Sequence, residues 1–326
     1  MRGIIKMTAR TALVLAVMVL AAFVLVSVSP VDPLSANVGQ AALGSMSPEQ
    51  VERLKEYWGV GQPVAERFVK WAGDFLRGDM GVSLLYRRPV AQVIAERFTA
   101  SLGIMTAAWV CSGVLGILLG ASAGIRRGGA ADKIVTGYSL VTASTPAFWL
   151  ALILLMVFSV WLRVFPIGFG APIGVEAADV TLADRVSHGI LPAAALTVTG
   201  ISSIALHTRE KMLQVMESDY VLFARARGES TWTIVRRHGL RNILLPAVTL
   251  QFASVSELLG GTILVEQVFS YPGMGQAAVN AGLGGDVPLL MGIVAVSGCM
   301  VCAGNLAGNI INSLVDPRIR EGAGRR

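Results

Sequence analysis

Six long stretches that are nearly free of charged side chains set the strongest constraint on the fold of this chain. An apolar run of about 18 or more residues is long enough to cross a bilayer as a helix. Only 15% of the 326 residues are charged, whereas soluble domains carry about 25%. The sequence therefore predicts an all-α membrane protein with six transmembrane helices. The predicted spans are 11–28, 99–124, 134–162, 190–206, 243–265 and 287–313.

The first stretch also has features of a secretory signal, because Arg2, Lys6 and Arg10 precede it. The apolar core of a signal is about 7 to 15 residues long, whereas this stretch has 18 residues. We therefore predict an uncleaved first span.

Basic residues in the connecting segments predict the orientation, because Lys and Arg stay on the cytoplasmic side. Four segments carry net charges of +2 or +3, and the three segments between them carry 0, −1 and −2. Both termini are therefore predicted to be cytoplasmic. The net charge of +6 follows from this topology and gives no support to nucleic-acid binding. The basic segments are 1–10, 125–133, 207–242 and 314–326, and the others are 29–98, 163–189 and 266–286.

The predicted organisation has four parts. The segment after the first span is too long for a simple turn, and Ser47 is placed to cap a helix there. We expect a small external helical segment at this position. The parts are an N-terminal tail with the first span (1–28), the external segment (29–98), a transmembrane core (99–313) that contains the inner segment 207–242, and a C-terminal tail (314–326).

The inner segment 207–242 is predicted to form two short helices that meet at a glycine corner. Gly228 can end the first helix, and Ser230 can cap a second helix that runs to His238. A short amphipathic helix with small residues suits docking into a groove of a partner protein. The alternative is a basic loop that binds anionic lipid headgroups. The face predicted for the first helix comprises Tyr220, Phe223, Ala224 and Arg227.

Residues 219–228, followed by 240–246, resemble the coupling loop of ABC importer permeases in the dipeptide, oligopeptide and nickel group. Further matches to this group occur in order along nearly the whole chain. They include 29–33, 78–83, 88–90, 95–97, 146–151, 188–192, 259–261, 266–275 and 316–320.

The resemblance implies a binding-protein-dependent permease in a bacterial or archaeal inner membrane. Its implied partners are a second homologous permease, two ATP-binding subunits, an external solute-binding protein and membrane lipid. ATP and magnesium would be bound by the ATPases, because this chain has no phosphate-binding loop and no predicted catalytic or metal-binding residue. The substrate is left open between dipeptides, oligopeptides, nickel and metal chelates. The residues implied to couple to the ATPase are Asp219, Tyr220, Phe223, Ala224, Arg225, Ala226, Arg227 and Gly228.

Polar residues within the predicted spans are candidates for the translocation path or for the interface with the second permease. Polar groups at membrane depth are costly and face protein or water. Asn305, Asn309 and Asn312 share one stripe of the last span, although family members often carry an aspartate at the position of Asn309. Ser254 and Glu257 belong to the fifth span.

Two other classes of function compete with this prediction. An intramembrane protease would need Ser202 and His207 to act together, but five residues of helix leave them about 140° apart. A stand-alone carrier or channel is expected to show inverted repeats, or broken helices with clustered ionisable groups. Neither pattern is visible in the sequence. Cys299 and Cys302 lie one turn apart, and we interpret them as small core residues and not as a soft-metal site.

Overall fold

The computed structural model describes residues 2–28, 43, 46–57, 63–176 and 179–315, with side chains from residue 12 to residue 308 of these ranges. Every named element in this part is a helix, so the predicted all-α class is confirmed there. In chain order the elements are α1 (Arg2–Val28), α4 (Pro48–Tyr57), α5 (Val64–Leu76), α6 (Val90–Gly124), α7 (Ala130–Ala143), α8 (Ala147–Leu154), the π-helical η1 (Leu155–Trp161), α9 (Leu182–Met216), α10 (Asp219–Ala226), α11 (Thr231–Ile234), the π-helical η2 (Val235–Gly239), α12 (Leu240–Ala253), α13 (Val255–Val268), α14 (Met274–Leu283) and α15 (Val287–Val315).

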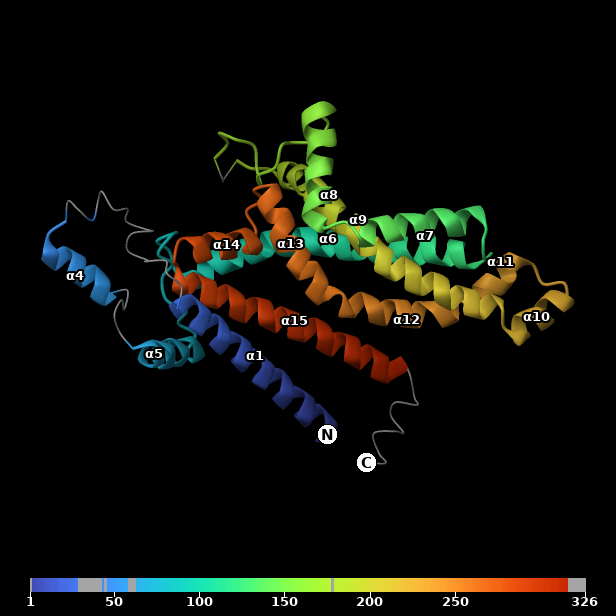
Figure 1. Ribbon diagram of the computed structural model, residues 1–326, viewed down its shortest axis with the longest axis horizontal. Helices are drawn as coiled ribbons and strands as arrows, with labels where there is room; N and C mark the ends of the chain where they lie inside the picture. The colour runs from blue at the N-terminus through green and yellow to red at the C-terminus, as the bar shows by residue number, and fades with distance from the viewer. Residues whose placement is uncertain (1, 29–42, 44–45, 58–62, 177–178, 316–326) are drawn as a thin grey trace. The chain divides into compact units, whose positions relative to one another are not determined.

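The chain divides into two compact units. Figure 1 colours the helices from blue at the N-terminus to red at the C-terminus. Unit 1 comprises Met1–Ser101 and Pro272–Cys302, and unit 2 comprises Leu102–Tyr271 and Ala303–Arg326. The long helices α6 and α15 each contribute residues to both units.

Aromatic side chains join α5 to α1 in unit 1. The ring of the buried Phe23 lies 5.2 Å from that of Phe68 and 6.2 Å from that of Trp71. Phe68 and Trp71 are three residues apart, so both lie on the face of α5 that packs against α1. The two helices predicted after the first span are present as α4 and α5. Ser47 caps α4 as expected, because its Oγ accepts a hydrogen bond from the Gln50 N–H at 3.3 Å.

A buried carboxylate connects two distant segments of unit 1. Asp286 is fully buried, and its Oδ2 accepts hydrogen bonds from Ser83 Oγ at 2.5 Å and from the Leu85 N–H at 3.0 Å. Its Oδ1 accepts from the Leu289 N–H at 3.2 Å, which caps α15. The start of α15 is therefore fixed to the loop that precedes α6. Helix α14 lies in the segment 266–286, where no helix was predicted.

Three glycines let α6 pack closely against α9 in unit 2. A Cβ atom at Gly116 would lie 2.8 Å from Ile204 Cβ, and one at Gly124 would lie 2.5 Å from Met212 Cβ. Gly120 lies between these two positions at the same four-residue spacing. Small residues at this spacing allow the backbones of membrane helices to approach each other.

Two predicted spans are broken in unit 2. The stretch 134–162 was predicted as one helix, but α7 and α8 meet at an angle of 105°. Pro146 lies between them, and a proline both lacks an N–H and disfavours a helical residue before it. The stretch 243–265 is likewise divided into α12 and α13, which are bent by 49° at Ser254.

Several helices are suited to a membrane. Three of them, α6, α9 and Val287–Gly308 of α15, are long and apolar enough to cross a bilayer, and counting each bent pair as one span gives five. The first predicted span corresponds to a shorter apolar helix, Ala12–Val28. Multiple membrane passages are therefore supported, and the sixth span stays a prediction.

Candidate functional site

The inner segment 207–242, predicted to dock a partner, begins within the last turns of α9, and α10 and α11 lie together after that helix (Figure 1). The turn after α10 contains Gly228, whose φ of +82° glycine adopts without strain. The Gly228 N–H donates to Arg225 O at 2.9 Å, and the Glu229 N–H donates to Ala224 O at 3.1 Å. These bonds satisfy carbonyls that the helix end leaves open. The predicted glycine corner is therefore present.

The second helix of the segment is longer than predicted. Ser230 caps it as expected, because its Oγ accepts a hydrogen bond from the Thr233 N–H at 3.3 Å. The predicted end at His238 is wrong, because the helix continues through η2 into α12. Gly239 permits this continuation beneath Met212, since a Cβ there would lie 3.0 Å from Met212 Cε. The corner is thus connected directly to a predicted span.

Helix α10 has a buried face and an exposed face. Val221 and Ala224 are fully buried or nearly so. Phe223 is 70% exposed, Leu222 is 65% exposed and Tyr220 is 44% exposed, so this side of α10 carries large side chains that the rest of the chain does not cover. Ala224 lies one turn from Tyr220, but it is buried beside Val221, so the predicted face is covered at Ala224 and exposed at Phe223.

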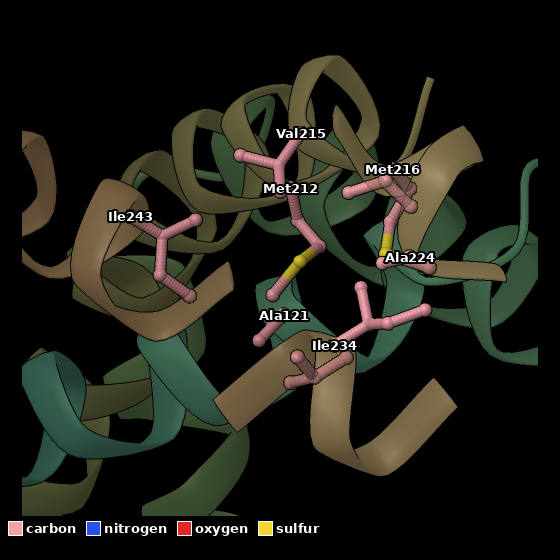
Figure 2. Close-up of a cluster of buried hydrophobic side chains, with 9 residues drawn as sticks. Ala121, Met212, Val215, Met216, Ala224, Ile234 and Ile243 are labelled. Atoms are coloured by element: carbon pink, nitrogen blue, oxygen red, sulfur yellow. The ribbon is translucent and has the colours of Figure 1, made fainter. Parts of the chain in front are cut away.

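The buried face of α10 rests on a hydrophobic cluster that combines α6, α9, α10, α11, η2 and α12 (Figure 2). Met212 has no exposed surface and contributes its flexible thioether to the cluster. These helices therefore share one packed core, which joins α10 to α9 and α12. The cluster comprises Ala121, Met212, Val215, Met216, Val221, Ala224, Ile234, Val235 and Ile243.

Charged and aromatic side chains surround the exposed face of α10. Arg227 Nη2 donates to Glu229 Oε1 at 2.6 Å across the corner. The rings of Tyr220 and His238 are 5.6 Å apart. Trp232 is 72% exposed and places a second large apolar surface on α11. The remaining predicted coupling residues, Asp219, Arg225 and Ala226, are all exposed.

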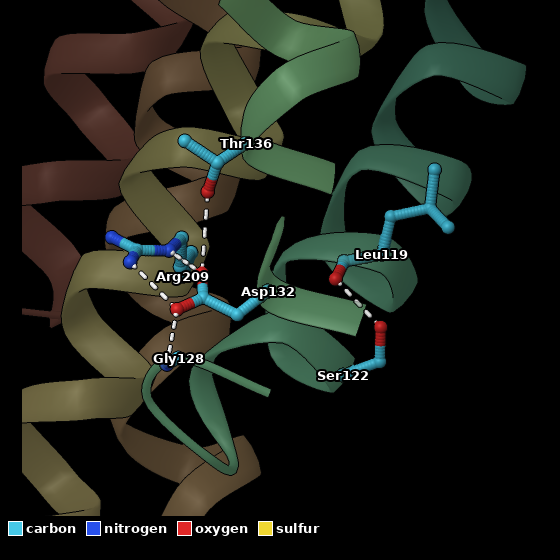
Figure 3. A network of polar contacts seen from close by, with 6 residues as sticks. All are labelled: Leu119, Ser122, Gly128, Asp132, Thr136 and Arg209. Atoms are coloured by element: carbon cyan, nitrogen blue, oxygen red, sulfur yellow. Dashed lines mark hydrogen bonds and ion pairs between the residues drawn. The ribbon is translucent and has the colours of Figure 1, made fainter. Parts of the chain in front are cut away.

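An ion pair fixes the start of α7 to α9 (Figure 3). Arg209 donates to Asp132 twice, from Nε to Oδ1 and from Nη2 to Oδ2, the second at 3.0 Å. The Gly128 N–H at 2.8 Å and the Thr136 hydroxyl at 3.2 Å complete the set of donors. The side chains are 6% exposed for Asp132 and 21% exposed for Arg209. Sequence analysis missed this pair, because its members are 77 residues apart.

A second polar contact lies at the bend between α12 and α13. The Trp109 Nε1–H donates to Gln251 O at 2.9 Å, and Gln251 Nε2 donates to Trp109 O at 2.5 Å. Ser254, at the bend itself, donates from Oγ to Gln251 O at 2.8 Å. These bonds satisfy polar groups within two predicted spans and connect α6 to the bend. Of the three residues, only Ser254 was predicted to be functional.

Comparison with known proteins identifies the family. Residues 116–321 match the family described as binding-protein-dependent transport system inner membrane component. The chain belongs to this family. The oligopeptide transport system permease protein AppB of Bacillus subtilis (strain 168) is 32% identical over 97% of this chain and 98% of its own length. A probable peptide ABC transporter permease protein, y4tP, of Sinorhizobium fredii is 31% identical over the same shares. The resemblance read from the motifs is confirmed.

Three of the path candidates of this inner membrane component have side chains among the described residues. Glu257 and Asn305 are exposed, and Ser254 is half-buried at the bend. Gly260, one turn after Glu257, has no atom within 4 Å of where a Cβ would lie. Their roles stay predictions. Asn309 and Asn312 belong to α15, but their side chains lie outside the described residues.

The observations that bear on the competing functions are mixed. Ser202 Oγ donates to Thr199 O at 2.7 Å, and His207 Nδ1 lies 2.9 Å from Ser203 O, so each is bonded within its own helix. The sequence argument against a carrier used the absence of broken helices with clustered ionisable groups, and two of the predicted spans are bent. His188 is buried, and its Nδ1 lies 2.6 Å from Gly168 O.

Proposed function

We propose that this chain is one of two permease subunits of an ATP-driven importer for peptides. Relatives at 31% to 33% identity over 97% of the chain carry names of oligopeptide or peptide permeases. In the proposed complex, two cytoplasmic ATPases bind ATP and magnesium, and an external solute-binding protein delivers the peptide. Both chain termini lie in the cytoplasm, so that α10 faces the ATPase.

The observation that carries the proposal is the exposed apolar face of α10, a helix whose opposite face is packed into the buried cluster. Phe223 and Leu222 are mostly exposed, while Val221 and Ala224 on the opposite side are held in the buried cluster. An amphipathic helix of this kind binds by placing its apolar side chains in a groove. Arg225 and Arg227 can add charge-assisted hydrogen bonds at the edge of that groove.

The path is proposed to run along the uncovered face of α13. Glu257 is exposed there, next to the mostly apolar stretch 258–265 of the same helix, and such a residue needs a polar partner or water within a membrane. Closure of the ATPases on α10 would shift the permease pair between inward-facing and outward-facing states. Transport by Glu257→Gln at the wild-type rate would remove this residue from the path.

Replacement of Phe223 tests the docking face. We expect Phe223→Ala to weaken copurification of the ATPase subunits by about tenfold or more, the effect of removing an aromatic anchor from an interface. The matched control is Leu140→Ala, because Leu140 is a 58% exposed apolar residue of α7. Equal ATPase recovery from the two variants would contradict docking through α10. Loss of lipid binding with intact ATPase recovery would instead assign the face to headgroups.

The substrate class is tested on the cognate solute-binding protein. Native mass spectrometry after incubation with a casein-derived pool of short peptides is expected to show bound peptide. Incubation with nickel chloride, alone and with histidine, provides the comparison. Capture of the metal or its complex in preference to peptide would overturn the peptide assignment while leaving the permease assignment intact.

A further inference from the structure

We propose that the Asp132–Arg209 pair makes α7 move with α9, so that displacement of α10 is delivered to the break between α7 and α8. This inference rests on the proposed function, because it assigns a route for the movement that the ATPases produce. Asp132 and Arg209 act in it as positioning residues and do not contact the transported peptide.

The first step of the route runs from α10 to α9. Val221 and Ala224 of α10 share a packed core with Met212, Val215 and Met216 of α9. Arg209 lies seven residues before the end of α9, about two helical turns from that end. A movement of α10 therefore reaches Arg209 through helix backbone and close packing alone.

The second step runs from α9 to α7. The bidentate pair joins the two helices at the start of α7, and Tyr138 Oη donates to Val198 O at 2.7 Å further along. Val135 of α7 is buried with Ile201 and Ala205 between these two connections. Because the connections are spaced along α7, this helix cannot rotate on α9 while both are present.

The third step is the break itself. Helix α7 ends at Ala143, and α8 starts at Ala147 with a change of direction of 105° (Figure 1). At such a break, a small number of residues absorbs the change of φ and ψ when the helix on one side moves. Helix α8 also packs against α13, which carries Glu257. The movement is thus transmitted from the docking helix to the proposed path.

The test measures peptide transported per ATP hydrolysed in the complete complex in proteoliposomes, with the casein-derived peptide pool and the loaded solute-binding protein. Asp132→Asn is expected to lower this ratio about fivefold, the lower end of typical coupling between sites. Ser122→Ala is the matched control, because its hydroxyl donates only to Leu119 O of its own helix at 2.7 Å (Figure 3). An unchanged ratio in an assembled Asp132→Asn complex would overturn the proposal.

A cross-linking experiment separates transmission from folding. In a background without Cys111, Cys299 and Cys302, the double variant Asp132→Cys with Arg209→Cys is expected to be uncoupled until a short bifunctional thiol reagent joins the two positions. If cross-linking restores the wild-type ratio of peptide to ATP, the result supports rigid transmission through this contact. This test can be read even if the Asp132→Asn complex fails to assemble. Continued uncoupling after cross-linking overturns the proposal. Absence of transport by the wild-type complex would count against the proposed function instead.

Discussion

Two buried carboxylates organise the two units in different ways. Asp286 of unit 1 accepts hydrogen bonds from the Ser83 hydroxyl and from two backbone N–H groups, which are all neutral donors. Asp132 of unit 2 is paired with the cationic guanidinium of Arg209. The backbone donors around Asp286 belong to a loop and a helix start that have no other way to satisfy those groups. Asp132 also accepts the Gly128 N–H from the turn before α7, but its cationic partner Arg209 projects from a different helix, α9. We infer that Asp286 fixes the fold, whereas Asp132 joins two elements that can move.

Each carboxylate joins segments that the charge pattern places on one side of the membrane. Ser83 and Asp286 fall in segments predicted to be external, and Asp132 and Arg209 fall in segments predicted to be cytoplasmic. A contact between an external and a cytoplasmic segment would have contradicted the topology. The contacts within each unit therefore agree with the predicted alternation.

The largest effect is expected from Asp286→Ala. This change leaves the donors of Ser83, Leu85 and Leu289 without their acceptor in a fully buried site, which costs about 3 kcal/mol of unfolding free energy. Denaturant-induced unfolding in detergent measures it. Asp286→Asn keeps a carbonyl acceptor and is expected to lose less than half as much. A stable Asp286→Ala protein with impaired coupling would reverse the roles assigned to the two carboxylates.

A smaller effect is expected from Gly124→Ala, which tests the packing that positions Arg209. The new Cβ would lie 2.5 Å from Met212 Cβ and 2.6 Å from Arg209 O, and overpacking of this kind costs about 2 kcal/mol. Because α9 must shift, coupling should fall with stability. Gly137→Ala is the control, since no atom lies within 4 Å of its Cβ position and alanine favours a helix by about 1 kcal/mol. A stable, fully coupled Gly124→Ala would show that the spacing of α6 and α9 is unimportant.

Much of the fold was predictable from local sequence, and its bends were not. Length and hydropathy located the helices, because a bilayer selects apolar runs of a set length. Ser47, Gly228 and Ser230 gave correct helix boundaries, because capping and left-handed turns are local chemistry. Pro146 was a visible signal for the 105° break and was not used. The break at Ser254 has no proline to mark it, and it lies one turn after Gln251, which bonds to Trp109 of α6.

The position of the candidate site along the chain was predictable, but which of its side chains are buried or exposed was not. Residues 219–228 were recognised as a motif, but the sequence did not show that Ala224 is buried while Phe223 is exposed, because burial depends on contacts with other helices. Gln251 and Arg209 could not be found, since their partners are 142 and 77 residues away in the sequence. The four-residue spacing of Gly116, Gly120 and Gly124 was available and was missed.

The smallest effect is expected from Thr136→Val. This change tests whether a neutral hydrogen-bond donor to Asp132 contributes to coupling as the cationic donor Arg209 does. The change removes one 3.2 Å hydrogen bond and should cost about 1 kcal/mol of unfolding free energy. Coupling should stay at the wild-type value, because Arg209 still holds both carboxylate oxygens. Thr142→Val is the control, since its hydroxyl donates to carbonyls of its own helix, the nearer being Tyr138 O at 2.9 Å. If Thr136→Val lowered transport per ATP as much as Asp132→Asn, neutral donors would matter equally at both carboxylates. The contrast between Asp132 and Asp286 would then be lost.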